Sequence, residues 1–186
     1  MRRLICLLIV INFLLICLPG KSYCYAAAAQ PELQWDYLTP IGDDRNIDTV
    51  SLHILKKFSE TKNRSIYRGI TITRPHGDID WENQNRNSSA VGAGPVYMLR
   101  FEENHSGKLS VALDISGGFI VYNKRFPAGG EYYDFMWRIG PQFIYKISEN
   151  SSVNVGYMLM HVSNGLRANN PGYDAHGVSL DFVANF

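Results

Sequence analysis

The last nine residues of the chain read VSLDFVANF, residues 178–186, and this stretch decides the fold. Apolar and polar side chains alternate through it, and the apolar set runs to the terminal Phe186. Successive side chains of a β-strand point to opposite faces, so a period of two predicts a strand with one apolar face. We therefore expect the chain to finish inside a strand, without a polar tail.

The same alternation extends back through most of the chain. Its second face carries Arg100, Asp114, Arg138, Lys146 and Asp181, which is too much charge for an apolar core but suits an interior in which the charges pair. The alternating segments predict eight antiparallel strands. They are expected at 33–37, 50–54, 66–72, 91–101, 109–121, 135–147, 153–163 and 174–186.

Two features favour a membrane barrel over a soluble, lipocalin-like barrel, in whose strands apolar and polar side chains also alternate. The first is that expected connections differ in length, as in outer-membrane barrels with short periplasmic turns and longer outer loops. The second is the terminal strand, which resembles the C-terminal signal of such barrels. The fold class predicted is an all-β, eight-stranded antiparallel transmembrane β-barrel of the outer membrane, too narrow for a pore. The short connections are 59–64, 102–107 and 148–152, and the long ones are 74–90 and 124–133.

The first 27 residues have the pattern of a cleaved secretory signal. Two arginines precede an apolar run of about 15 residues, and small residues follow at Ala26 to Ala29. An uncleaved anchor is the alternative, but a bilayer-spanning helix needs about 20 apolar residues. We expect residues 1–27 to be removed and 28–186 to form a single barrel domain. All three cysteines lie in the removed segment, so thiol chemistry is excluded.

The charge balance argues against nucleic acid as a partner. The full chain carries 18 Lys and Arg against 17 Asp and Glu, and removal of the signal leaves 15 against 17. A nucleic-acid-binding domain is expected to be strongly basic instead. The sequence contains no internal repeat and no low-complexity linker.

Polar residues capable of catalysis extend the outward face of the last two strands. The odd positions from Val153 continue through His161 and Ser163, and the even positions from Val178 run back through His176 to Asp174. In an antiparallel pair these strand ends are neighbours, so a hydroxyl, an imidazole and a carboxylate converge at the lipid-exposed rim. Nucleophilic acyl transfer needs these three groups. The alternative interpretation is a polar strand end at the headgroup level.

Two motifs resemble the lipid A 3-O-deacylase (PagL) family: HVSNG at 161–165 and NNPGYD at 169–174. The likeness continues less specifically over 107–165. The resemblance implies an eight-stranded outer-membrane barrel that hydrolyses the ester of the acyl chain at position 3 of lipid A. It also implies His161 as general base and Ser163 as nucleophile, with Asn164 as an oxyanion donor and Gly165 with it in the oxyanion or substrate-binding site.

The group that orients His161 has two candidates, Asp174 and His176. Well-known family members carry a glutamate near this point, whereas the nearest carboxylate here is Asp174. A carboxylate stabilises an imidazolium better than a second neutral imidazole does, and weak screening near lipid strengthens that preference. We therefore predict Asp174 as the partner, with His176 as a possible substitute or headgroup contact.

The expected partners are lipid A, or lipopolysaccharide, and the lipids of the outer membrane, with the active site toward the outer leaflet. The sequence neither predicts nor excludes a homodimer. No metal or cofactor is demanded by this mechanism. The alternative function is a non-enzymatic outer-membrane barrel, acting as an adhesin or structural envelope protein through its outer loops, chiefly residues 74–90 with Trp81.

Overall fold

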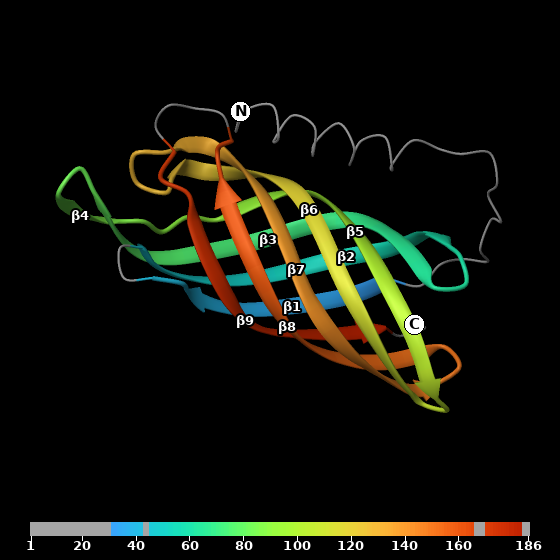
Figure 1. Ribbon diagram of the computed structural model, residues 1–186. Helices are drawn as coiled ribbons and strands as arrows, with labels where there is room; N and C mark the ends of the chain where they lie inside the picture. Colours follow the sequence, from blue (N-terminus) through green and yellow to red (C-terminus); the bar gives the residue numbers. More distant parts are fainter. Residues whose placement is uncertain (1–30, 43–44, 166–169, 184–186) are drawn as a thin grey trace, which may run out of the picture.

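A computed structural model describes residues 31–42, 45–165 and 170–183 (Figure 1). The expected signal peptide 1–27, the terminal Phe186 and the middle of the loop between the last two strands lie outside the described residues. The described chain forms nine β-strands. They are β1 (Pro31–Pro40), β2 (Arg45–Glu60), β3 (Arg64–Trp81), β4 (Gln84–Asn87), β5 (Gly92–Ser106), β6 (Leu109–Phe126), β7 (Glu131–Ser148), β8 (Ser151–Ser163) and β9 (Tyr173–Val183).

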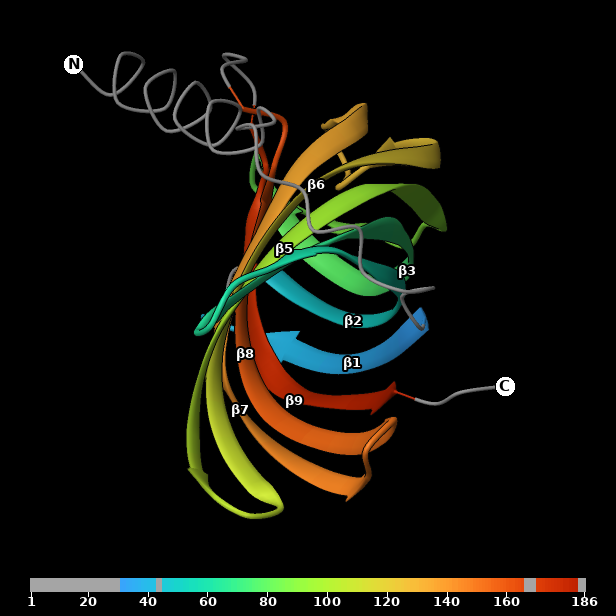
Figure 2. The same cartoon turned by 90° about the vertical axis from the view of Figure 1, so that its right-hand side faces the viewer.

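Eight of these strands close into a ring. β1 pairs with β2 on one side and with β9 on the other, so the first and last strands of the barrel are neighbours. All neighbouring strands around the ring run antiparallel, and the two views show the twisted barrel that results (Figures 1 and 2). β4 is a short additional strand that pairs with β3. The predicted eight-stranded antiparallel barrel is confirmed. Among the described residues, no helix has the length and apolar character needed to cross a bilayer.

The two long connections expected from the sequence are mostly strand, so that expectation is wrong in extent. Residues 74–81 continue β3, which turns back into β4 through Glu82 and Asn83, both with positive φ (54° and 60°). Two such residues are typical of a type I′ hairpin turn. Likewise, β6 and β7 leave only residues 127–130 between them. The apolar alternation stops earlier because outward side chains above the belt, such as Arg74, are polar.

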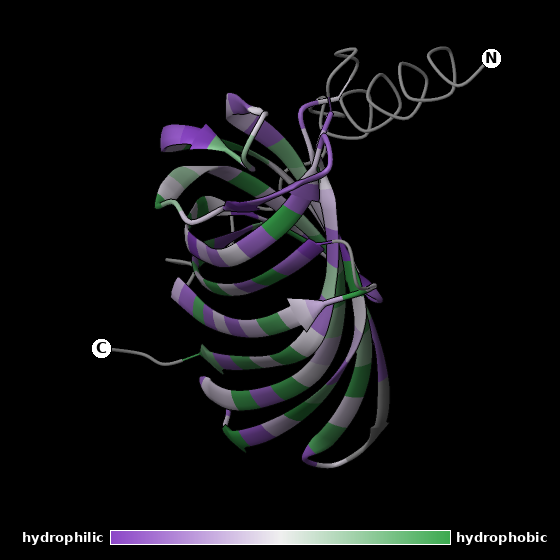
Figure 3. Ribbon diagram, turned by 90° about the vertical axis from the view of Figure 1, so that its left-hand side faces the viewer, coloured by the Kyte–Doolittle hydropathy of each residue, from purple (hydrophilic) through white to green (hydrophobic). Residues whose placement is uncertain are grey.

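The outward face of the barrel is apolar. Among the large apolar side chains that are exposed there, the exposed fraction runs from 36% for Leu52 to 58% for Phe143. Figure 3 shows that hydrophobic and hydrophilic residues alternate along the strands. A wide belt of exposed apolar side chains around a closed sheet is what an outer-membrane barrel presents to lipid.

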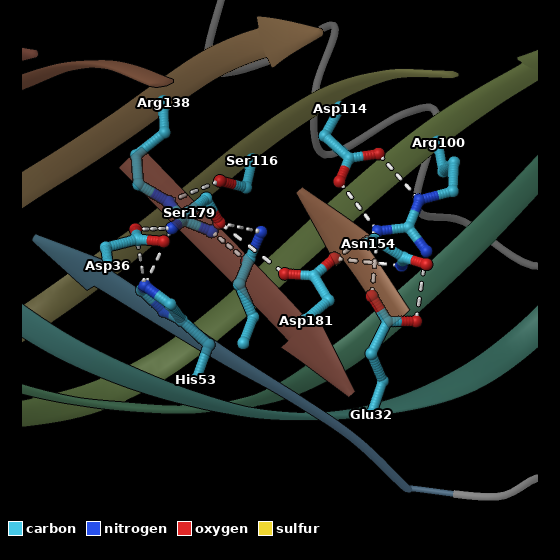
Figure 4. Close-up of polar contacts among 11 residues, drawn as sticks. Glu32, Asp36, His53, Arg100, Asp114, Ser116, Arg138, Asn154, Ser179 and Asp181 are labelled. Atoms are coloured by element: carbon cyan, nitrogen blue, oxygen red, sulfur yellow. Dashed lines mark hydrogen bonds and ion pairs between the residues drawn. The ribbon is translucent and has the colours of Figure 1, made fainter. Parts of the chain in front are cut away.

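The interior holds two groups of buried charges that lie at different levels of the barrel (Figure 4). In the first, the guanidinium of Arg100 lies within 2.9 Å of carboxylate oxygens of Glu32, Asp114 and Asp181. All four side chains are at least 97% buried. The predicted pairing of these inward charges is confirmed for Arg100, Asp114 and Asp181, and Glu32 joins them.

The second group is built around Arg138, which is fully buried. Its guanidinium donates to Asp36, to Gln34 Oε1 at 2.7 Å and to Ser116 Oγ at 3.0 Å. His53 Nε2 lies 3.1 Å from Asp36 Oδ2 and completes the group (Figure 4).

Lys146 differs from the other predicted interior charges. It lies near the end of β7 with 43% of its side chain exposed, and Glu102 is 3.8 Å away. The interior is filled partly by these polar contacts and partly by a cluster of buried apolar side chains that includes Met98, Phe126 and Met158, so the expectation that the inner face holds no apolar core is wrong in part. A filled interior agrees with a barrel that has no pore.

The two ends of the barrel differ. At one end, β1 begins and β9 ends, and the three connections 61–63, 107–108 and 149–150 are short. The opposite end carries the β3–β4 hairpin, residues 127–130, and the connection from β8 to β9. Short turns are typical of the periplasmic side of outer-membrane barrels, and the first end has turns of this length.

Candidate active site

His161 and Asp174 lie side by side on the outer wall of the barrel, at the end of the longer connections. They are directly opposite each other in the ladder between β8 and β9. His161 Nδ1 is 2.7 Å from Asp174 Oδ1. The exposed fractions of the two side chains are 34% and 54%. When Nδ1 donates to this carboxylate, the other ring nitrogen, Nε2, is left to act as a base.

The other flank of His161 is formed by Trp137. It is the residue opposite His161 on β7. The two rings are 5.8 Å apart between centroids and inclined at 32°. Trp137 is itself half-exposed on the outer wall. The imidazole therefore has a carboxylate on the β9 side and an indole on the β7 side, which restricts its orientation.

Ser163 is the last residue of β8. It lies two residues after His161, so both side chains point to the outer face. Its neighbour across the ladder is Phe135, and its own side chain is half-buried.

The end of the connecting loop packs against Ser163. A Cβ added at Gly172 would lie 2.9 Å from Ser163 Cβ and 2.5 Å from the carbonyl oxygen of Val162. The carbonyl of Gly172 also accepts a hydrogen bond from the guanidinium of Arg45, at the start of β2. Only glycine permits this close approach, so the loop encloses one side of the serine.

Asn164 and Gly165 begin the loop, and they differ from Ser163 in burial and in backbone conformation. The Asn164 backbone N–H donates to Asn170 Oδ1 at 3.1 Å, and Asn164 is only 3% exposed. Gly165 is exposed and has φ +79°, a left-handed conformation that favours glycine. Asn170 Nδ2 donates to the Gly165 carbonyl at 3.3 Å. Asn164 is therefore buried where the loop begins, and its predicted contribution to an oxyanion site stays a prediction.

His176 lies further along β9, opposite Leu159. Its Nδ1 atom forms a hydrogen bond with the hydroxyl of Tyr157, and the two rings are 5.7 Å apart between centroids. Of the two residues considered as partners of His161, the structure places Asp174 in hydrogen-bond contact with it and pairs His176 with tyrosine.

Sequence reasoning missed four residues around this cluster: Trp137, Phe135, Gly172 and Asn170. The first two face His161 and Ser163 through the register of the β7–β8 ladder, which an irregularity between Lys146 and Ser148 shifts by one residue from the pairing at the turn. The alternation of β7 already puts Trp137 and Phe135 outward. Nothing in the sequence signals the approach of Gly172 or the contacts of Asn170, since both depend on the path of the loop.

Within the described ranges, no group of three His, Cys, Asp or Glu side chains is arranged to hold a metal ion. The expectation that no metal or cofactor takes part stays a prediction. Fold and cluster together define a class of protein: a small bacterial outer-membrane β-barrel with a candidate hydrolytic site on its lipid-facing wall.

The family follows from comparison with known proteins. The model of the lipid A 3-O-deacylase (PagL) family matches residues 53–182, which include all the side chains of the cluster. The chain belongs to this family, as its two motifs predicted. The family is one of lipid A deacylases, which are ester hydrolases, and its proteins lie in the bacterial outer membrane.

The fold resembles that of a solved outer-membrane enzyme. The crystal structure of the outer membrane enzyme PagL is similar, with a TM-score of 0.55 and 14% sequence identity over 81% of this chain and 97% of that one. The outer membrane protein AlkL, solved by solid-state NMR, has a TM-score of 0.35 at 11% identity over 90% of this chain and 92% of that one, too low to support an argument. No curated protein sequence matches the chain.

Proposed function

We propose that this chain removes the 3-O-linked acyl chain of lipid A as a serine esterase, with Ser163 as nucleophile, His161 as general base and Asp174 as the acid that orients the base. The observation that carries the proposal is the 2.7 Å contact between His161 Nδ1 and Asp174 Oδ1. It joins base and acid on the same outward face that bears the serine two residues along the strand.

The reaction has two steps in this proposal. His161 Nε2 takes the Ser163 hydroxyl proton as Oγ attacks the ester carbonyl, and Asp174 stabilises the imidazolium that forms. The tetrahedral intermediate collapses to an acyl-enzyme, and the sugar hydroxyl leaves with the proton from His161. Water, activated by the same base, then releases the fatty acid and restores the serine.

The oxyanion needs hydrogen-bond donors beside Ser163. We propose the backbone N–H of Gly165 as one donor, because this residue is exposed at the start of the loop. Asn164 stays in the proposal as the residue that shapes this turn, since its backbone N–H already donates to Asn170. Loss of one oxyanion donor typically lowers the rate about 100- to 1000-fold.

The position of the cluster supports a lipid substrate drawn from the outer leaflet. Trp137 and Phe135 are about half-exposed beside His161 and Ser163, and offer apolar surface to an acyl chain. The site lies at the barrel end opposite the short turns, which puts it toward the outer leaflet in this proposal. An ester buried among acyl chains would reach it without leaving the membrane.

The test measures fatty acid released from purified lipopolysaccharide by the folded barrel in detergent micelles. Ser163→Ala and His161→Ala should each abolish release while the protein still shows heat-modifiable migration on a gel. Ser151→Ala, at the other end of the same strand, is the matched control and should keep the wild-type rate. Wild-type turnover by Ser163→Ala would refute the nucleophile, and a wild-type barrel that releases no fatty acid would favour a non-enzymatic barrel.

A further inference from the structure

A hollow on the outer wall, away from the catalytic cluster, brings two cations together. It measures about 310 Å³ and lies over β2, β3 and β5, which are neighbours in the ring. Lys56 and Arg68 are directly opposite each other in the β2–β3 ladder, and Tyr97 is opposite Arg68 on β5. The remaining lining is apolar or backbone. It consists of Gly69, Ile70, Pro95 and Val96.

The two cations have no carboxylate partner in the described part of the chain. Two other exposed basic residues each contact a carboxylate: Lys57 is 2.9 Å from Glu60, and Arg86 is 3.1 Å from Glu82. Arg68 instead lies over the ring of Phe58, with its Cζ atom 4.5 Å from the ring centroid. An aromatic contact of this kind holds the guanidinium in place without neutralising its charge.

The hollow lies in the part of the apolar belt nearer the end at which β1 begins, with Phe58 as a further exposed apolar residue beyond Lys56 on β2. The next outward residues toward the middle of the barrel are Ile54 on β2 and Ile70 on β3, both about half-exposed. Lys56 is also paired in register with Pro31, where β1 begins at the end with the short turns. The long side chains of the two cations can reach headgroup depth, while the apolar part of the hollow extends toward the acyl chains.

We infer that this hollow binds one anionic phospholipid of the periplasmic leaflet, with its phosphate between Lys56 and Arg68 and an acyl chain along Ile70 and Tyr97. A phosphate diester supplies the negative charge that the described residues do not. Arginine and lysine together suit it, since one offers a planar fork of donors and the other a compact charge.

Lipid A is a poor fit, because it occupies the outer leaflet and this hollow is at the opposite end from His161 and Asp174. The inference does not depend on the proposed catalytic mechanism.

The experiment counts lipids retained by the full barrel in native mass spectrometry after exchange into micelles with equal amounts of dioleoyl phosphatidylglycerol and dioleoyl phosphatidylethanolamine. The wild-type protein should retain one phosphatidylglycerol in clear preference. Lys56→Gln and Arg68→Gln should each lower that preference roughly fivefold, as expected for one cation near a membrane surface. The double variant should show none. Arg64→Gln is the matched control, because Arg64 shares strand and face with Arg68 and lies outside the hollow.

Two further readouts keep the inference falsifiable if retention is low. Rising salt should reduce phosphatidylglycerol retention by the wild type and leave the double variant unchanged. Deacylation of lipopolysaccharide by the double variant should stay at the wild-type rate. Equal retention by all variants, no preference in the wild type, or displacement of phosphatidylglycerol by an equal amount of lipid A would overturn the inference.

Discussion

Replacing Asp174 by Asn tests the arrangement of the candidate site most directly. The substitution keeps the size of the side chain and removes its charge. Asp174 is 54% exposed and contacts His161 at the surface, so the barrel has no packing to lose. The amide can also present its NH₂ to Nδ1, which would favour the wrong tautomer of the imidazole. We expect the folded amount to stay constant and the rate to fall.

The size of the effect follows from the charges. Two unit charges 4 Å apart interact by about 1 kcal/mol in water and about 4 kcal/mol at an effective dielectric constant of 20. The 34% exposure of His161 and its lipid-facing position put this pair between the two limits. Since about 1.4 kcal/mol corresponds to tenfold in rate, the charge alone accounts for roughly 5- to 1000-fold. We expect a loss of about 100-fold, below the roughly 10⁴-fold found where such an aspartate is buried.

The assay compares single-turnover release of fatty acid from lipopolysaccharide in mixed micelles. Asp174→Glu should recover part of the rate, because a carboxylate is restored with one extra methylene. His176→Ala should stay close to wild type, since its contact is with Tyr157. Labelling of Ser163 by a fluorophosphonate should slow in parallel with turnover in Asp174→Asn, which a merely structural contribution would not produce.

The reasoning is refuted if Asp174→Asn turns over at the wild-type rate while His161→Ala is inactive. It is also refuted if His176→Ala is the more damaging of the two substitutions. That result would move the orienting group two residues along β9.

Three further outcomes are expected. Gly172→Ala should slow deacylation without unfolding the barrel, because its methyl would press on Ser163 and on the Val162 carbonyl; an unchanged rate would show that the loop end can move away. Arg100→Met should destabilise the barrel by about 3–5 kcal/mol in denaturant titrations, since it leaves buried carboxylates without their cation; an unshifted midpoint contradicts this. Asp134→Asn should keep or raise stability, by up to ~1–3 kcal/mol, because neither buried carboxylate oxygen has a hydrogen-bond partner among the described residues; marked destabilisation would indicate a partner.

The alternation of apolar and polar residues in the sequence predicted the strands and the faces to which their side chains point. The count of alternating segments predicted the eight strands of the ring, and the period of two predicted the outward direction of His161, Ser163 and Asp174, because this period assigns each side chain to a face. The same reasoning put Arg100 and Arg138 inside but left out Glu32, Asp36 and His53, the partners that complete their groups. Those partners lie far from the arginines along the chain, and only closure of the ring brings them near.

The paths of the loops could not be predicted from the alternation of apolar and polar residues. The hairpin of β3 and β4 continues above the apolar belt, where polar side chains cover the outer face and remove the alternation that marked the strand below. The packing of Gly172 on Ser163 likewise depends on a chain path with no periodic signal. The turn also has a positive φ at Glu82, which is uncommon for glutamate although not for the asparagine that follows, so the sequence did not indicate this turn type.

Interior and outer wall are coupled through strand register. On the outer face of the β8–β9 ladder, His161 stands opposite Asp174; on the inner face of the same ladder, Asn154 stands opposite Asp181 and donates to it at 3.2 Å. A slip of one residue would move every side chain of a strand to the other face. It would break the inner contact and bury the imidazole at once. The buried polar group therefore fixes the register on which the surface cluster depends, although it touches none of the residues proposed to do the chemistry.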